Sequence, residues 1–198
     1  MGPALDARED VRRRQVHPRL RVTASPYLRL IDEGEATGEL RREYEAARAR
    51  AGKVMNILKG MSLSPRVLSP FLALNRAINF EESELDRIDR ELLAVVVSRA
   101  NGARYSLRAH EEMLRDLGGP EELDARRRAL GVFAEKLTRS PADMSGQDVE
   151  TLRSHGLSDA AISDAIQVVA FFNHVNRVVN AVGVDDEPEW ASAPTVGS

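Results

Sequence analysis

The sequence predicts an all-α fold, a helical bundle with short loops, from two observations. Apolar residues recur at intervals of three and four along most of the chain, which is the period of an amphipathic helix. Glycine, proline and capping residues separate these segments at short intervals, and no segment is convincing as a strand. A chain of 198 residues is long enough for one buried core and short for two.

The first two expected helices are amphipathic. Residues 38–51 consist largely of Glu, Arg, Ala and Leu, which are strong helix formers. The serine-proline pair at 64–65 is a typical helix start, and apolar residues at helical spacing continue to Ile78.

Residues 86–100 are expected to form a buried central helix. The run from Leu92 to Val97 is rich in β-branched residues and would also suit a buried strand. However, the segment is long, has no internal breaker and ends at Asn101 and Gly102, a typical helix stop. Ser83, three residues before Asp86, is the expected N-terminal cap.

The second half of the chain continues the helical pattern. Further helices are expected at 103–117, 124–138, 145–154 and 158–182. In the second of these, the residues expected to face the core are Leu130, Val132, Phe133 and Leu137. The last helix is apolar almost all round, so it is expected to be buried by its own protein or by a second subunit.

Three regions are expected along the chain. Residues 1–26 are polar, rich in arginine and interrupted by prolines, which indicates an N-terminal arm. Residues 27–184 form a single helical domain, and the acidic residues 185–198 form an exposed C-terminal tail.

Composition and charge disfavour several kinds of partner. A net charge of −3 gives no attraction to nucleic acid, and the arginine clusters at 12–14 and 126–128 have acidic neighbours that indicate solvated faces. No apolar run approaches the roughly 20 residues that span a bilayer, and the N-terminus lacks a secretory signal, so neither a membrane partner nor export is expected. The cytoplasm is the expected compartment.

Cofactor and metal chemistry find little support in the sequence. The chain has no cysteine, which excludes disulfide, thiolate and zinc-thiolate chemistry. None of its four histidines are paired at a spacing of four residues, and no glycine-rich phosphate loop is present. We therefore expect neither a metal nor a cofactor.

One helix face carries the candidate site. Ala103, Ser106 and His110 are spaced by three and four residues, which places their side chains on the same side of one helix. Positions 103 and 106 lie in its first turn, where free N–H groups and the helix dipole stabilise negative charge.

Residues 101–110 read N-G-A-R-Y-S-L-R-A-H, and this resembles the motif N-G-C-x-Y-C-x-x-x-H. That motif is the redox site of the alkylhydroperoxidase D-like (AhpD-like) peroxidase-related proteins of the carboxymuconolactone decarboxylase superfamily. Three further segments resemble the family, at 52–58, 133–141 and 172–177, although Met55 replaces a family proline. The resemblance covers roughly residues 27–184 and implies an AhpD-like helical bundle.

The resemblance implies roles for individual residues. Ala103 and Ser106 stand where the family has its two redox cysteines, Tyr105 lies between them, and Glu91 and His110 correspond to the proton relay. The family activity is thiol-dependent peroxide reduction in antioxidant defence. Because a serine hydroxyl is much less acidic than a thiol, this oxidoreductase activity is not expected of the chain. The cysteines were either lost in evolution or replaced by substitution.

Two other functions remain open. Decarboxylases of the same superfamily work without a cysteine pair, so Glu91 and His110 could be an acid-base pair acting on a lactone or keto acid, with Ser106 as hydrogen-bond donor or nucleophile. Alternatively, the chain is a catalytically silent oligomer that binds a small molecule.

The site and assembly predictions each compete with a simpler interpretation. Glu91 could be a surface carboxylate, but its apolar neighbours favour burial. His174 suits a polar group of the core or of an interface better than a catalyst. The apolar helices and the resemblance together predict a dimer-based homo-oligomer, with a trimer or hexamer as the larger forms.

Overall fold

The computed structural model describes residues 26–192, and within that range it is helical with no strand. The all-α prediction is confirmed. The helices are α1 (Gly38–Ala51), α2 (Asn56–Gly60), α3 (Pro65–Asn79), α4 (Arg87–Ala100), α5 (Arg104–Asp116), α6 (Ala125–Arg139), α7 (Gly146–Ser154) and α8 (Asp159–Val182), with short 3₁₀ turns η2 (Pro141–Asp143) and η3 (Pro188–Ser192). Only the short α2 was not predicted, and the expected N-terminal arm lies almost wholly outside the described residues.

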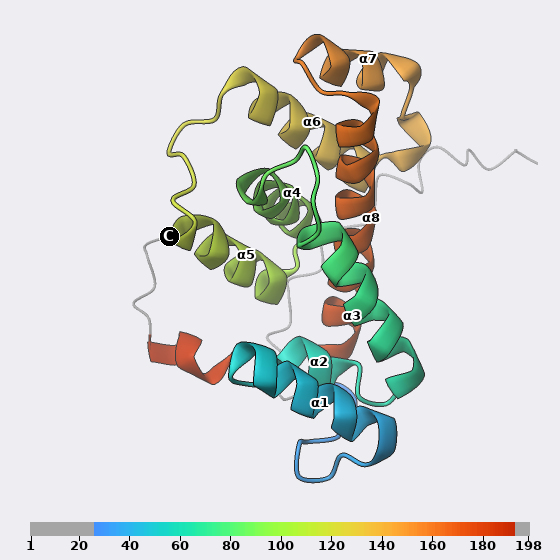
Figure 1. Cartoon of the computed structure of the whole chain (residues 1–198), viewed down its shortest axis with the longest axis vertical. Helices are drawn as coiled ribbons and strands as arrows, with labels where there is room; N and C mark the ends of the chain where they lie inside the picture. The colour runs from blue at the N-terminus through green and yellow to red at the C-terminus, as the bar shows by residue number, and fades with distance from the viewer. Residues whose placement is uncertain (1–25, 193–198) are drawn as a thin grey trace, which may run out of the picture.

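Helix α4 is the centre of the bundle. It packs against α5, α6 and α8, and most of its side chains are buried. Figure 1 shows α8 running along the long axis of the molecule, with α6 and α7 near one end and α1 and α2 near the other. None of the described helices combines the length and apolar character needed to cross a bilayer.

The buried apolar residues form two clusters. The larger one joins α4, α5, α6 and α8, and the smaller one joins α1, α2 and α3. Ile57, Phe71 and Val178 contact both clusters. The two clusters are therefore connected. Helices α1, α2 and α3 pack around the smaller one at one end of the molecule.

The cap of α4 differs from the prediction. Asp86, and not Ser83, caps the helix, because its side chain accepts a hydrogen bond of 2.7 Å from the backbone N–H of Asp89. The Ser83 hydroxyl instead donates to Asp164 of α8 and accepts from the N–H of Leu85. Ser83 thus ties the loop before α4 to α8.

One residue of α6 faces the wrong way for the predicted core. Leu130 and Phe133 are buried and Leu137 is partly buried, but Val132 is 70% exposed. At about 100° per residue, Val132 lies on the side of the helix opposite to Leu130. The apolar character of a residue was a poor guide there, and the helical period was the better one.

The arginine cluster at 126–128 is not simply a solvated face. Asp89 of α4 is only 1% exposed, and its two carboxylate oxygens accept hydrogen bonds of 2.7 Å from Arg126 and 2.8 Å from Arg127. A buried carboxylate requires such partners. Two of the three arginines therefore anchor α6 to α4.

The C-terminal segment was also predicted wrongly. Residues 185–198 were expected to be an exposed tail, but Glu187 and Trp190 are buried. The acidic sequence was misleading because Glu187 binds groups inside the protein, as described below.

Candidate functional site

The turn between α4 and α5 places the candidate residues. Gly102 has a positive φ of 61°, which reverses the chain after α4, and Ala103 is the N-terminal cap residue of α5. Ala103 is fully buried, and its N–H donates a 2.9 Å hydrogen bond to the carbonyl of Ser98. Ser106 is the third residue of α5, so it lies in the first helical turn as expected.

Glu91 and His110 are in direct contact. Glu91 of α4 is 4% exposed, and its Oε2 lies 2.7 Å from Nδ1 of His110 on α5. The expectation that Glu91 is buried is confirmed. The His110 ring also packs edge-on against Phe172 of α8, with 4.5 Å between ring centroids. The imidazole is therefore held by one hydrogen bond and one ring contact.

Arg87 completes the surroundings of the Glu91 carboxylate. Its Nη2 donates a 2.6 Å hydrogen bond to Oε1, the oxygen that His110 does not use. The guanidinium also donates to the carbonyl of Asn79 and lies 4.3 Å from the centre of the Phe80 ring. Arg87 was not predicted as a site residue, although its spacing of four residues before Glu91 was a usable signal.

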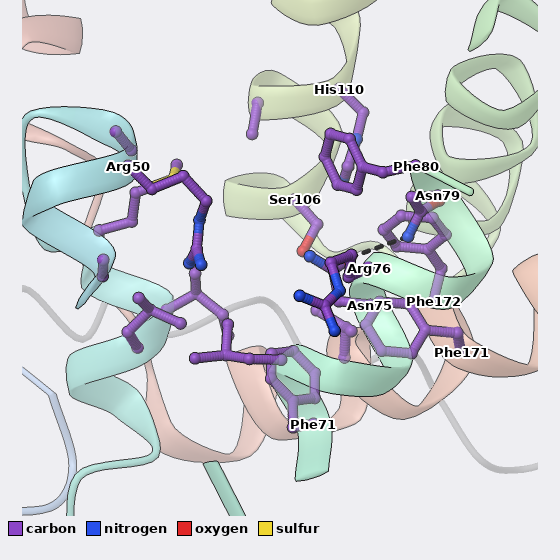
Figure 2. A pocket seen from close by; sticks show the side chains of 18 of the residues that line it. Arg50, Phe71, Asn75, Arg76, Asn79, Phe80, Ser106, His110, Phe171 and Phe172 are labelled. Carbon is purple, nitrogen blue, oxygen red and sulfur yellow. Dashed lines mark hydrogen bonds between the residues drawn. The ribbon is translucent and has the colours of Figure 1, made fainter. Parts of the chain in front are cut away.

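A cavity of about 590 Å³ lies beside this pair. Glu91, Ser106 and His110 all line it, whereas Ala103 does not. Most of the remaining lining is apolar and comes from α2, α3, α5 and α8, including Ile57, Leu58, Phe71, Leu72, Ala109, Met113, Phe171, Phe172 and Val175. Figure 2 shows Ser106 and His110 on α5 across from the phenylalanines.

Among the described residues, two polar atoms beside the Glu91–His110 contact lack a protein partner, in addition to the buried Nε of Arg87. They are the Ser106 hydroxyl and Nε2 of His110. A histidine with Nδ1 fixed by a carboxylate presents its other nitrogen for proton transfer. The free hydroxyl and the free ring nitrogen are thus the groups that a molecule in the cavity would meet.

Tyr105 also lines the cavity, and other segments of the chain fix its hydroxyl. Its hydroxyl donates a 2.5 Å hydrogen bond to Glu187 and accepts a longer one, 3.4 Å, from the N–H of Ile57. Burial, with the neighbouring Glu187 carboxylate, raises the pKa of Tyr105 well above its ordinary value. Its ring packs on Trp190, 5.1 Å between centroids.

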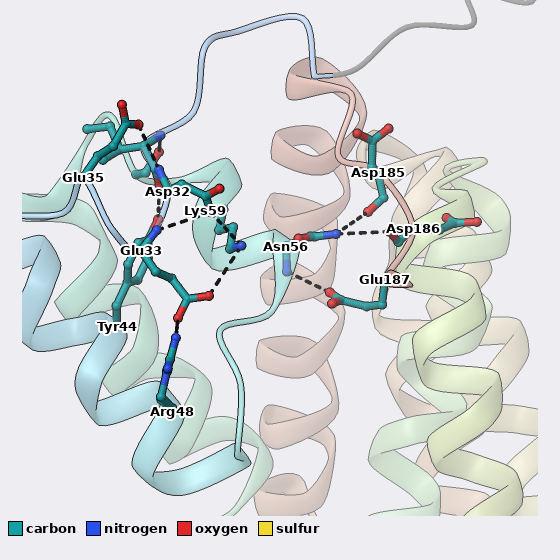
Figure 3. Close-up of polar contacts among 12 residues, drawn as sticks. Asp32, Glu33, Glu35, Tyr44, Arg48, Asn56, Lys59, Asp185, Asp186 and Glu187 are labelled. Carbon is teal, nitrogen blue, oxygen red and sulfur yellow. Dashed lines mark hydrogen bonds and ion pairs between the residues drawn. The ribbon is translucent and has the colours of Figure 1, made fainter. Parts of the chain in front are cut away.

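The C-terminal segment thereby joins the site to α2. Glu187 also accepts a 2.7 Å hydrogen bond from the N–H of Asn56, and the Asn56 side chain donates to the carbonyls of Asp185 and Asp186. Figure 3 shows these contacts between α2 and the chain that follows α8. No signal in the acidic sequence 185–187 indicated this role.

Metal ligands are sparse near the pair. Across residues 26–192, no group of three histidine, aspartate or glutamate side chains is arranged to hold a metal ion. His174 is exposed on α8, so it is not a core group, and it lines a separate apolar groove of α3 and α8. His155 is exposed at the end of α7.

Comparison with known proteins places the chain in a family. Residues 65–134 match the model of the carboxymuconolactone decarboxylase family. The structure of an uncharacterized peroxidase-related protein from Silicibacter sp. TM1040 is similar, with 33% identity, a TM-score of 0.75, and coverage of 86% of this chain and 98% of that one. No curated protein sequence matches the chain.

Two other solved structures share the fold. An uncharacterized peroxidase-related protein with an alkylhydroperoxidase AhpD core, from Ralstonia eutropha JMP134, is 25% identical over 83% of this chain and 94% of that one, with a TM-score of 0.74. The debrominase Bmp8 is 17% identical over 80% of this chain and 91% of that one, with a TM-score of 0.65. The chain therefore belongs to the carboxymuconolactone decarboxylase superfamily and, within it, to the AhpD-like peroxidase-related proteins.

Proposed function

We propose that this AhpD-like protein catalyses acid-base proton transfer on a small carbonyl compound, a lactone or keto acid, and does not act as a thiol peroxidase. The observation that carries the proposal is the 2.7 Å contact between Glu91 and His110 at the wall of a cavity. The family supplies the scaffold, and the residues at positions 103 and 106 decide against thiol chemistry.

The geometry suits His110 as the proton-transferring group. With Nδ1–H donated to Glu91, Nε2 carries the lone pair that faces the cavity. Arg87 binds the other oxygen of Glu91, so the carboxylate cannot rotate without losing a hydrogen bond. Glu91 is then a positioning residue, in the way that a carboxylate orients the histidine of a catalytic triad.

The proposed step needs only the substrate and the side chains of the site. His110 Nε2 takes a proton from the carbon next to a carbonyl, and the electron pair moves onto the carbonyl oxygen as an enolate. The imidazolium then returns the proton to carbon. Ser106, in the first turn of α5, donates a hydrogen bond to the developing oxyanion, where the helix N-terminus also favours negative charge.

Thiol turnover is disfavoured by the chemistry of the replacements. Ser106 has a hydroxyl, which does not form a disulfide, and Ala103 has no reactive group at all. We expect no peroxide consumption with a dithiol reductant. Sustained peroxide turnover by the purified chain would contradict the proposal.

The direct test is exchange of carbon-bound protons. A panel of lactones and keto acids is incubated in D2O with the protein and followed by proton NMR. We expect His110→Ala to lower the exchange rate by about 10²- to 10⁴-fold, the usual contribution of a general base. His155→Ala, which removes an exposed histidine at the end of α7, is the matched control and should keep the full rate.

The outcomes separate the candidate functions. Equal exchange rates for wild type and His110→Ala would rule out the proposed role of His110. A protein that binds a small molecule in the cavity but exchanges no proton from any compound of the panel would instead be the catalytically silent binding protein, which the cavity alone supports.

We also propose a homo-oligomer, dimer-based and extending to a trimer or hexamer. Exposed apolar side chains on α3, such as Val67 and Leu74, support association. Sedimentation velocity at micromolar concentrations measures the state, and a monomer at all concentrations would contradict the proposal.

A further inference from the structure

Two arginines enter the cavity from different helices. Arg50 is in the last turn of α1 and Arg76 is in the last turn of α3, and both line the cavity while remaining exposed to solvent. Figure 2 shows the two guanidinium groups directed into the space between α1 and α3, with Ser106 behind them. The lining thus has one exposed arginine from α1 and one from α3, in a cavity whose walls are mostly apolar.

These guanidinium groups are weakly engaged by the protein. Within the described residues Arg50 has no acceptor, whereas Arg41 and Arg48 of the same helix are paired with glutamates. Arg76 has only a 3.8 Å ion pair with Glu81, and its side chain is 75% exposed. Their donors are therefore available to a bound molecule.

The charge balance at the cavity favours an anion. Its lining contains two carboxylates, Glu43 and Glu91, and Glu91 is occupied by Arg87 and His110. Lys53 is paired with Glu187 and Glu189. With Arg76 3.8 Å from Glu81, Arg50 is the cation of the lining that no described carboxylate pairs with.

The inner part of the cavity is built for a hydrocarbon body. Phe171 and Phe172 are buried there, and Phe71 stacks on Phe171 with 5.1 Å between ring centroids. A volume of about 590 Å³ exceeds what a single hydrocarbon chain or ring requires, and cavities of this size typically hold small organic molecules.

We propose that the cavity binds a monocarboxylate with an apolar body, its carboxylate held by Arg50 and Arg76 and its body packed on the phenylalanines. Guanidinium groups bind carboxylates through paired, charge-assisted hydrogen bonds. The proposal rests on the proposed function in one respect: it selects keto acids over uncharged lactones as the substrate class.

Binding is tested without turnover, by isothermal titration calorimetry at low ionic strength. The probes are octanoate and octanol, which share the hydrocarbon chain and differ in the head group. We expect one octanoate per chain, bound at least about tenfold more tightly than octanol, since hydrogen bonds to charged groups are stronger than those to neutral ones. Added salt should weaken octanoate binding and leave octanol unchanged.

Matched variants locate the head group. Arg50→Met with Arg76→Met should reduce octanoate affinity to that of octanol. Arg42→Met with Arg66→Met removes one exposed arginine from each of the same two helices, away from the cavity, and should change nothing beyond the small effect of net charge. Unchanged melting temperatures show that all variants fold.

The contradicting outcomes are distinct from those of the proposed function. Absence of octanoate binding, equal binding of octanol, or full affinity in Arg50→Met with Arg76→Met would each overturn the carboxylate site. His110→Ala should still bind octanoate in a way that depends on Arg50 and Arg76. Loss of proton exchange in His110→Ala with retained, arginine-dependent octanoate binding supports both proposals, whereas proton exchange that does not depend on His110 overturns only the catalytic one.

Discussion

Glu91 is the residue on which the site geometry depends, because its two oxygens bind side chains with different tasks. One oxygen orients His110 from α5, and the other is bound by Arg87 from its own helix. Since the carboxylate is buried, removal of either partner leaves one of its oxygens without a hydrogen bond. The contact thus stabilises the buried carboxylate and, in the proposed function, orients the general base.

We expect Arg87→Met to lower the free energy of unfolding by about 3 kcal/mol, the usual cost of breaking a buried ion pair from one side. Arg41→Met is the matched control, because Arg41 and Glu45 form a pair of the same spacing with both side chains exposed. It should cost no more than about 0.5 kcal/mol. Urea denaturation measures both, and equal costs would show that Glu91 does not need Arg87.

Restoring the thiols tests whether the proton relay still works. We expect Ala103→Cys with Ser106→Cys to give dithiol-dependent peroxide consumption, because a thiol in the first turn of α5 is stabilised as thiolate. Ser106→Cys alone lacks the partner for an internal disulfide and should turn over more slowly. A folded double variant without activity would show that the cavity has diverged from peroxide chemistry.

At the scale of elements, the segment after α8 connects α5, which carries Ser106 and His110, to α2. Glu187 links Tyr105 of α5 to α2, and Trp190 covers the Tyr105 ring. The structure therefore holds the protonated phenol, whose pKa is raised by burial and by Glu187. Burial also raises the pKa of Tyr44 in α1, to about 12.

This predicts a loss of stability in alkali. Below pH 10 both the folded and unfolded states carry the Tyr105 proton, so its contribution is complete. Above pH 10 the unfolded state releases the proton first, and the unfolding free energy falls by up to about 1.4 kcal/mol per pH unit for each such group. Tyr105→Phe should have a shallower decline in urea denaturation between about pH 10 and 11. If the unfolding free energies of the variant and the wild type fell equally over this pH range, the prediction would be contradicted.

Local signals in the sequence predicted the helices well because their starts and stops are encoded within a few residues. The Ser145 capping box and the αL glycines after α1 and α8 are such signals, and each lies at a helix end in the structure. The burial of Glu91 also followed from its immediate apolar neighbours. These features need no knowledge of distant parts of the chain.

Contacts between distant segments were beyond the same reasoning. Glu187 lies 82 residues from Tyr105, and its acidic neighbours gave it the appearance of a solvated tail. Arg127 lies 38 residues from Asp89, and the buried partner made a polar cluster structural. Arg50 and Arg76 were likewise ordinary helix residues until the packing of α1 and α3 directed both into one cavity.

At the scale of the whole molecule, the cavity lies between the two apolar clusters. Its walls include Leu58 and Leu72, which pack with the smaller cluster, and Phe171 and Phe172 of the larger one. Helix α1 belongs only to the smaller cluster and packs chiefly on α3, whereas α4 is surrounded. A bound carboxylate held by Arg50 and Arg76 would therefore connect α1 to α3, at the end of the molecule where α1 has fewer packing neighbours.

Hydrogen exchange should reveal this difference in local stability. We expect the amides of α1 to exchange through a partial opening that costs less free energy than the opening of α4, because fewer buried contacts are lost.

Opening α1 releases the ligand, so octanoate at a hundred times its dissociation constant should raise the free energy of opening α1 by up to about 2.7 kcal/mol. Helix α7 contributes no residue to the cavity, so its local opening should be unaffected. Equal protection of α1 and α4 without ligand would show that the bundle opens only as a whole. If octanoate raised the protection of α7 as much as that of α1, the ligand would be acting on global stability alone.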